Sequence, residues 1–105
     1  MSDFCIVLWT ASSFDKAKKV VRLLLDEKLI ACATLIDNAH SMYVWNGEIE
    51  FEKEVQVIIK SLKSKFSEIK LMIQENSSYD VPEVLLIEVK DGLDSYLSWI
   101  EDEVT

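Results

Sequence analysis

The segment from Glu48 to Lys60 constrains the fold more than any other part of the chain. Apolar residues occupy the odd positions 49, 51, 55, 57 and 59, and polar residues occupy the even positions 48, 50, 52, 54, 56 and 60. A period of two is typical of a β-strand with one buried face. Asn46-Gly47 precedes it and suits the positive φ angles of a type I′ turn, and Ser41–Trp45 favours extended structure. The sequence therefore predicts a long β-hairpin, with Lys53 at a bulge or an exposed stretch.

The segment before this hairpin predicts two strands and a helix. Phe4–Ala11 and Ile30–Ile36 are apolar runs of strand length, and Asp37-Asn38 interrupts the second. Between them, Ser12-Ser13 offers an N-cap to an amphipathic helix that runs to about Lys28.

The segment after the hairpin predicts a second helix, a strand and a last helix. The second helix begins at Ser64 or Lys65 and ends near Gln74, Val84–Val89 forms a strand, and residues 93–100 form a short helix. The order β-α-β-β-α-β is that of the α+β, ferredoxin-like split βαβ fold, with both main helices on one face of an antiparallel sheet. We expect one domain over residues 1–105.

Composition limits the partners and the compartment. The chain has 19 acidic and 11 basic residues, a net charge of −8, which repels nucleic acid and anionic membrane. No apolar run reaches the roughly 18–20 residues that span a bilayer, and no basic segment precedes the first strand as in a signal peptide. Cys5 and Cys32 lie in apolar runs without a Cys-x-x-Cys motif. We expect both thiols to be buried and reduced, and the protein to be cytoplasmic.

The polar residues show no catalytic signature. Glu48, Glu50, Glu52 and Glu54 share one face of the predicted strand at spacings of roughly 6–7 Å, and a hard cation, another chain or plain solvent can offset their repulsion. Lys60 ends that strand and can pair with Glu54 or an anion. His40 is the only histidine and is predicted in a turn, whereas a metal site needs several converging donors. Two glycines cannot build a phosphate loop, so we predict no enzyme.

Aromatic residues predict self-association. Tyr43, Trp45 and Phe51 flank the hairpin, and two helices cannot cover an arm of this length. Exposed aromatic patches mark interfaces, and a long strand edge needs a partner. Because most oligomers are homo-oligomers with closed symmetry, copies of the chain are the expected cover.

Five segments, in this order and spacing, resemble the CutA divalent-cation-tolerance family. They are Glu27–Leu35, Ser41–Gly47, Glu54–Lys60, Tyr79–Glu83 and Tyr96–Ile100. The resemblance implies a ferredoxin-like fold, a tight homotrimer built like the PII signalling proteins, and a role in the response to divalent cations such as copper. It also implies a candidate cleft between subunits, formed by Cys32, Glu54, Lys60, Tyr79 and Glu83.

The chain departs from the family at the positions linked to copper. These positions hold Trp9, Asn76 and Ser77, which are poor copper ligands. We therefore expect no cofactor, no tight metal site, and only weak, salt-sensitive binding of divalent cations by the acidic surface. Three functions stay open: a trimeric binding or signalling module, a purely structural trimer that scaffolds a partner, and an enzyme that uses Glu54, Lys60, Tyr79 and Glu83 at the cleft.

Overall fold

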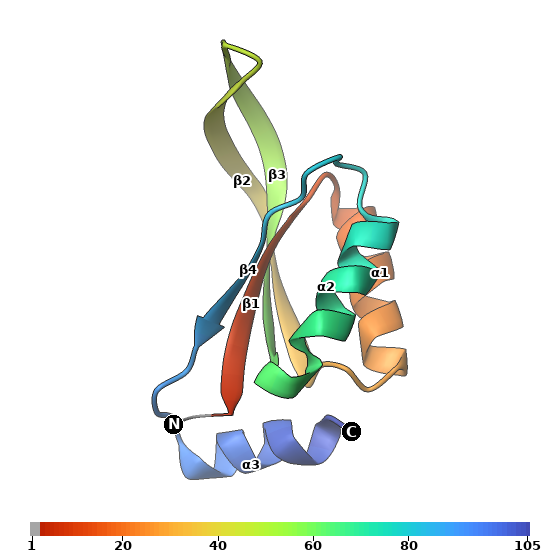
Figure 1. Cartoon of the computed structure of the whole chain (residues 1–105), viewed down its shortest axis with the longest axis vertical. Coiled ribbons are helices and arrows are strands. Elements are labelled where there is room, and N and C mark those ends of the chain that lie inside the picture. The colour runs from red at the N-terminus through yellow and green to blue at the C-terminus, as the bar shows by residue number, and fades with distance from the viewer. Residues whose placement is uncertain (1–2) are drawn as a thin grey trace.

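The computed structural model describes residues 3–105 and shows a twisted sheet with two helices on one face (Figure 1). The sheet has four antiparallel strands in the order β2-β3-β1-β4, which is the ferredoxin-like topology predicted above. In chain order the elements are β1 (Phe4–Ala11), α1 (Phe14–Asp26), β2 (Cys32–Trp45), β3 (Glu48–Leu62), the 3₁₀ turn η1 (Lys63–Lys65), α2 (Phe66–Asn76), β4 (Val84–Glu88) and α3 (Asp94–Glu103).

Local signals explain where the helices begin and end. Ser13 is the N-cap of α1, and its Oγ accepts a hydrogen bond of 3.1 Å from the Lys16 backbone N–H. The helix ends at Asp26, two residues before its predicted end, because Lys28 adopts a φ of 56°, which no α-helix accommodates. The helix α2 begins at Phe66, because η1 occupies the residues where the sequence predicted its start.

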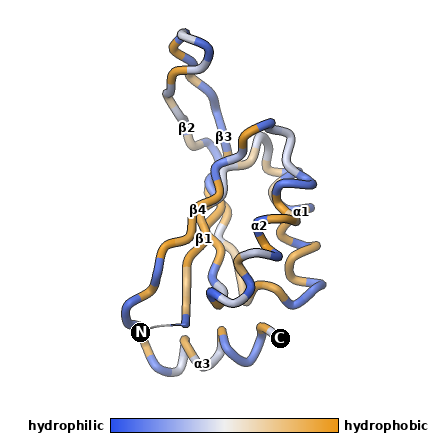
Figure 2. The backbone as a smooth tube through the Cα atoms, viewed as in Figure 1, coloured by the Kyte–Doolittle hydropathy of each residue, from blue (hydrophilic) through white to orange (hydrophobic). Residues whose placement is uncertain are grey.

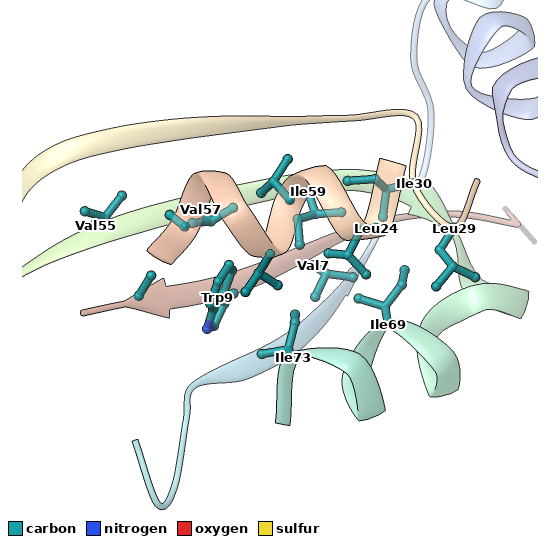
Figure 3. Close-up of a cluster of buried hydrophobic side chains, with 14 of the residues drawn as sticks. Val7, Trp9, Leu24, Leu29, Ile30, Val55, Val57, Ile59, Ile69 and Ile73 are labelled. Carbon is teal, nitrogen blue, oxygen red and sulfur yellow. The ribbon is translucent and has the colours of Figure 1, made fainter. Parts of the chain in front are cut away.

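The core lies between the sheet and the pair α1 and α2 (Figure 3). Trp9 and Val57 point from the sheet toward Leu24 of α1 and Ile73 of α2, and all four are fully buried. Cys5 is buried in the same cluster as predicted, and burial raises the pKa of its thiol to about 11. A smaller cluster under α3 joins Ile100 and Val104 to the end of the sheet.

The strand β2 differs from its prediction, because Asp37-Asn38 forms a bulge inside one 14-residue strand and does not end it. The register shifts between Ile36 and Ala39, where Asn38 adopts a φ of 63°. Asparagine tolerates this left-handed conformation better than most residues, so the ladder continues beyond the bulge.

The strand β3 is regular at Lys53, which pairs with His40, so a bulge at Lys53 was a wrong prediction. Lys53 is exposed, which was the alternative. The turn at Asn46-Gly47 has φ values of 52° and 80°, which fit a type I′ turn. Residues 39–54, the hairpin arm, project beyond both helices (Figure 1).

The face of the sheet opposite α1 and α2 carries apolar side chains on β1 and β4, and we call it the outer face. Registered pairs such as Ile6 with Ile87 and Leu8 with Leu85 alternate with the inward residues of β1 and β4. Figure 2 shows hydrophobic stretches along these two paired strands. Leu85 is 55% exposed and Ile87 is 45% exposed. Among residues 3–105, no helix combines the length and the apolarity needed to cross a bilayer.

Candidate functional site

A pocket of about 810 Å³ opens between the hairpin arm and the loop that leads into β4. Its walls combine carboxylates with aromatic rings. The carboxylates are Glu50, Glu52, Glu54, Asp80 and Glu83, and the rings are those of Tyr43, Trp45 and Tyr79. Among the described residues, the lining holds no Lys, Arg or His.

The pairing register of β2 with β3 determines which side chains of the arm face the pocket. Glu50 pairs across the hairpin with Tyr43, and Glu52 pairs with Ser41, so all four belong to the same face of the arm. Three glutamates of the predicted row, Glu50, Glu52 and Glu54, therefore line the pocket, whereas Glu48 at the tip of the arm is not part of its lining. Partial desolvation, followed by the charges of Glu52, Glu54 and Glu50, raises the pKa of the Tyr43 phenol.

The floor of the pocket is held by two long-range hydrogen bonds. The Tyr79 hydroxyl donates to Glu54 Oε2 at 2.6 Å, and the Thr10 hydroxyl donates to Glu83 Oε2 at 2.9 Å. Glu54 and Thr10 are each 7% exposed, whereas Tyr79 is half-buried and Glu83 is exposed, so both bonds are partly shielded from water. Burial, together with the hydrogen bond to Glu54, raises the pKa of Tyr79.

The predicted cleft residues fall into two groups within one chain. Glu54, Tyr79 and Glu83 line the pocket, whereas Cys32 and Lys60 face each other further along β2 and β3. Six residues of extended strand, roughly 20 Å, separate Glu54 from Lys60, so these two do not pair within the chain.

The second group has its own contacts. Lys60 Nζ donates to Thr34 Oγ1 at 2.7 Å and to the Ile58 carbonyl at 3.3 Å, and Cys32 Sγ lies 3.4 Å from the Tyr96 hydroxyl. This hydrogen bond, followed by burial, raises the pKa of Tyr96 to about 12. The prediction that Cys32 is buried was wrong for the single chain. Its side chain lies on the outer face, where Tyr96 covers it only in part.

The positions linked to copper do not meet. Trp9 lies in the core with its indole N–H unpaired, whereas Asn76 Nδ2 donates to the Met72 carbonyl at the end of α2. Ser77 accepts a hydrogen bond from the Tyr79 backbone N–H. His40 lies in β2, not in a turn as predicted, and stacks on Phe51 at 5.4 Å. Within residues 3–105, no three His, Cys, Asp or Glu side chains are grouped to hold a metal ion.

The predicted interface residues occupy both faces of the hairpin arm. Tyr43 and Trp45 line the pocket, whereas Phe51 pairs with Met42 on the opposite face. All three are at least 40% exposed.

Sequence reasoning missed Thr10 and Asp80 as pocket residues. Thr10 ends an apolar strand and lies 73 residues from its partner Glu83, so no local pattern links the two. Asp80 stands in a polar loop, where an acidic residue is ordinary.

Comparison with known proteins assigns the chain to a family. A family model described as CutA1 divalent ion tolerance protein matches residues 5–103. The chain belongs to the CutA1 family. The resemblance seen in the sequence is thereby confirmed.

Individual CutA proteins match over nearly their whole length. The divalent-cation tolerance protein CutA of Pyrococcus horikoshii is 42% identical over 98 residues, covering 93% of this chain and 95% of the relative. The crystal structure of CutA from Xylella fastidiosa superposes with a TM-score of 0.96 at 32% identity, covering 99% of this chain and 100% of that one. The periplasmic divalent cation tolerance protein CutA of Archaeoglobus fulgidus gives 0.94 at 30% identity, covering 97% and 99%. The Pyrococcus horikoshii and Archaeoglobus fulgidus relatives are named as divalent-cation tolerance proteins, and none of the three names describes an enzyme.

Proposed function

We propose that this CutA-family chain is a homotrimeric binding module in the response to divalent cations, copper among them, and that its ligand site is a cleft shared by neighbouring subunits. The link to divalent cations comes from the names of its relatives. The assembly and the cleft are argued from the outer face and from the two groups of polar residues described above.

The outer face supports self-association. It presents Leu85 and Ile87 to solvent beside the half-buried Ile6 and Leu8 of β1 and Ile58 of β3. A contiguous apolar surface of this kind is buried in assemblies, because its exposure to water is unfavourable. A second copy of the chain supplies the same apolar chemistry.

Complementary charge supports a shared cleft, and it is the observation that carries the proposal. Glu54 and Glu83 have no Lys or Arg within ion-pair distance, and Lys60 has no carboxylate partner, among residues 3–105. Two different patches that meet head to tail form a ring when the rotation closes, as in a trimer. In such a ring Lys60 of one copy approaches the exposed Glu83 at the pocket of the next, and Glu54 deeper in that pocket stays open to a ligand.

Sedimentation of the protein and of charge-reversal variants tests the assembly. We expect a species of three times the 12.1 kDa chain mass at low micromolar concentration. Lys60→Glu should weaken the trimer, because it places a carboxylate against the acidic pocket, and adding Glu83→Lys should restore part of the affinity. A monomer at these concentrations, or a double variant weaker than Lys60→Glu alone, would contradict the proposal.

Growth tests the physiological role. A strain that lacks its own CutA gene and expresses this chain should grow better at raised copper or zinc than the same strain with an empty vector. Equal growth of the two strains would contradict a role of this chain in metal tolerance. Fractionation of the same cells tests the cytoplasmic location, which we propose although the Archaeoglobus fulgidus relative is described as periplasmic.

The pocket favours a binding module over a purely structural trimer, because a scaffold needs no cleft of this size.

A further inference from the structure

We propose that the pocket beside the hairpin arm binds an organic cation that carries ammonium groups, and that its ligand is not a bare metal ion. This inference deepens the proposed function and rests on it, since it names the ligand class of the same cleft.

The size of the pocket points to a molecule. At about 810 Å³ it falls within the roughly 300–1,000 Å³ of small-molecule sites, far above the volume of a dehydrated ion. Its carboxylates are distributed along the walls, with Glu50 and Glu52 on the arm and Glu83 on the floor. No three such donors within residues 3–105 are close enough to share one metal ion. Carboxylates on separate walls of a pocket suit a ligand whose positive groups are also separated from one another.

Glu54 places an incompletely paired carboxylate in this pocket. It is only 7% exposed and belongs to the pocket lining. Its Oε2 accepts from Tyr79, but within residues 3–105 its Oε1 has no hydrogen-bond partner and the side chain has no cationic partner. The side chain is thus shielded from most solvent, but Oε1 remains accessible from the pocket, so an ammonium group that enters can donate a charge-assisted hydrogen bond to it.

Aromatic rings decide between an organic cation and a hydrated one. Tyr43, Trp45 and Tyr79 line the same cavity. The faces of aromatic rings attract ammonium groups, and the rings also pack against the methylene carbons that link two ammonium groups of one ligand. A hydrated Mg²⁺ ion gains nothing from such walls, because it binds through oxygen ligands and retained water.

The spacing of the glutamates indicates which organic cations fit the pocket. Neighbouring glutamates on this face of β3 lie roughly 6–7 Å apart. A four-carbon diamine places its two nitrogens at a similar separation, so one ammonium can reach Glu54 while the other reaches the neighbouring Glu52. We therefore expect short aliphatic diamines to bind more tightly than monoamines of equal length.

The test is calorimetric titration of the full chain with 1,4-diaminobutane at physiological salt, with native mass spectrometry of the same sample. We expect saturable binding of the diamine and none of 1,4-butanediol, which has the same length without charge. Glu54→Gln should lower the affinity for the diamine at least tenfold, since it removes the charge and keeps an oxygen for Tyr79. Glu75→Gln, an identical charge change on α2, should alter it less than twofold.

Further variants keep the outcome decisive. If Glu54→Gln fails to fold, Glu52→Gln on the exposed wall serves in its place, and Trp45→Ala should also weaken diamine binding. Saturable binding of Mg²⁺ that disappears in Glu54→Gln would overturn the inference. A trimer that does not bind the diamine would also overturn it. The measured mass decides the proposed assembly separately: a trimer without diamine binding leaves it intact, and a monomer contradicts it whatever the titration shows.

Discussion

At the scale of single residues, two polar groups show how the surroundings of a side chain set its effect. Trp9 and Tyr79 both carry a hydrogen-bond donor on an aromatic ring. The Trp9 indole N–H is buried and has no acceptor within residues 3–105, whereas the Tyr79 hydroxyl donates to the buried carboxylate of Glu54. An unmade hydrogen bond costs the full desolvation of the donor, whereas a made one recovers it. The two residues should therefore respond differently to loss of the donor.

Trp9→Phe should be nearly neutral for stability. The change removes an unpaired buried donor, which offsets the volume it leaves in the core, so we expect the free energy of unfolding to change by less than about 1.5 kcal/mol. Ile73→Ala in the same cluster is the comparison and should cost about 2–5 kcal/mol. Denaturant unfolding measures both. A large loss in Trp9→Phe would mean that the indole N–H has a partner after all.

Tyr79 should contribute to the alkaline limit of stability. Its pKa is raised above the ordinary value of 10.0, because burial and the bond to Glu54 favour the protonated phenol. A group whose pKa rises on folding gives full stability below its unfolded pKa and loses it as pH climbs toward the folded value. The free energy of unfolding should therefore fall above about pH 10, and less steeply in Tyr79→Phe. Parallel curves for the two proteins would contradict this.

At the scale of elements, the bulge in β2 determines how the hairpin arm leaves the sheet. Asp37 and Asn38 place an extra residue opposite Val55, and the strand continues to Trp45 beyond it. Bulges bend and twist the strand that carries them. The direction of the arm, and with it the wall of the pocket, therefore depends on one left-handed residue.

Asn38→Val should destabilise the protein by about 1–2 kcal/mol, because a β-branched residue resists the positive φ at this position. Asn38→Gly is the matched control and should cost little, since glycine adopts that conformation without strain. The side chain is exposed, so the difference between the two variants reports the backbone alone. Thermal unfolding of both gives the answer, and equal melting temperatures would exclude a role for the bulge.

At the scale of the whole molecule, the two faces of the sheet differ in what covers them. The inner face lies under α1 and α2 (Figure 1), whereas the outer face carries exposed apolar residues such as Leu85 and Ile87. The helices themselves expose comparable single residues, such as Leu71 on α2 at 57%. On the outer face, Leu85 and Ile87 lie on one side of β4 and pair with the apolar Leu8 and Ile6 of β1. A second exposed apolar group lies on the hairpin arm, where Met42 pairs with Phe51 and Val44 pairs with Ile49.

Leu85→Glu should therefore break the assembly and Leu71→Glu should not. The two leucines are 55% and 57% exposed and receive the same charge, so the pair differs only in location. We expect sedimentation at micromolar concentration to show monomers of Leu85→Glu and trimers of Leu71→Glu. Trimers of both variants would mean that the outer face is not the interface.

Patterns along the chain sufficed for the elements and the topology. Alternation in β3, the apolar run of β1 and the Asn46-Gly47 turn are local signals, and local signals decide local structure because φ, ψ and side-chain direction depend on near neighbours. The same alternation placed the glutamate row on one face. The exceptions were also local: a bulge that looked like a break, and a helix that ended two residues early at Lys28.

The pocket was decided only by tertiary structure. Thr10 meets Glu83 across 73 residues and Tyr79 meets Glu54 across 25, and the depth at which Glu54 is buried depends on all of these segments together. Tertiary structure also separated Lys60 from Glu54, which belong to one motif in the sequence but lie far apart on a rigid extended strand. A sequence states which chemical groups a chain possesses, whereas their convergence depends on how distant elements pack against one another.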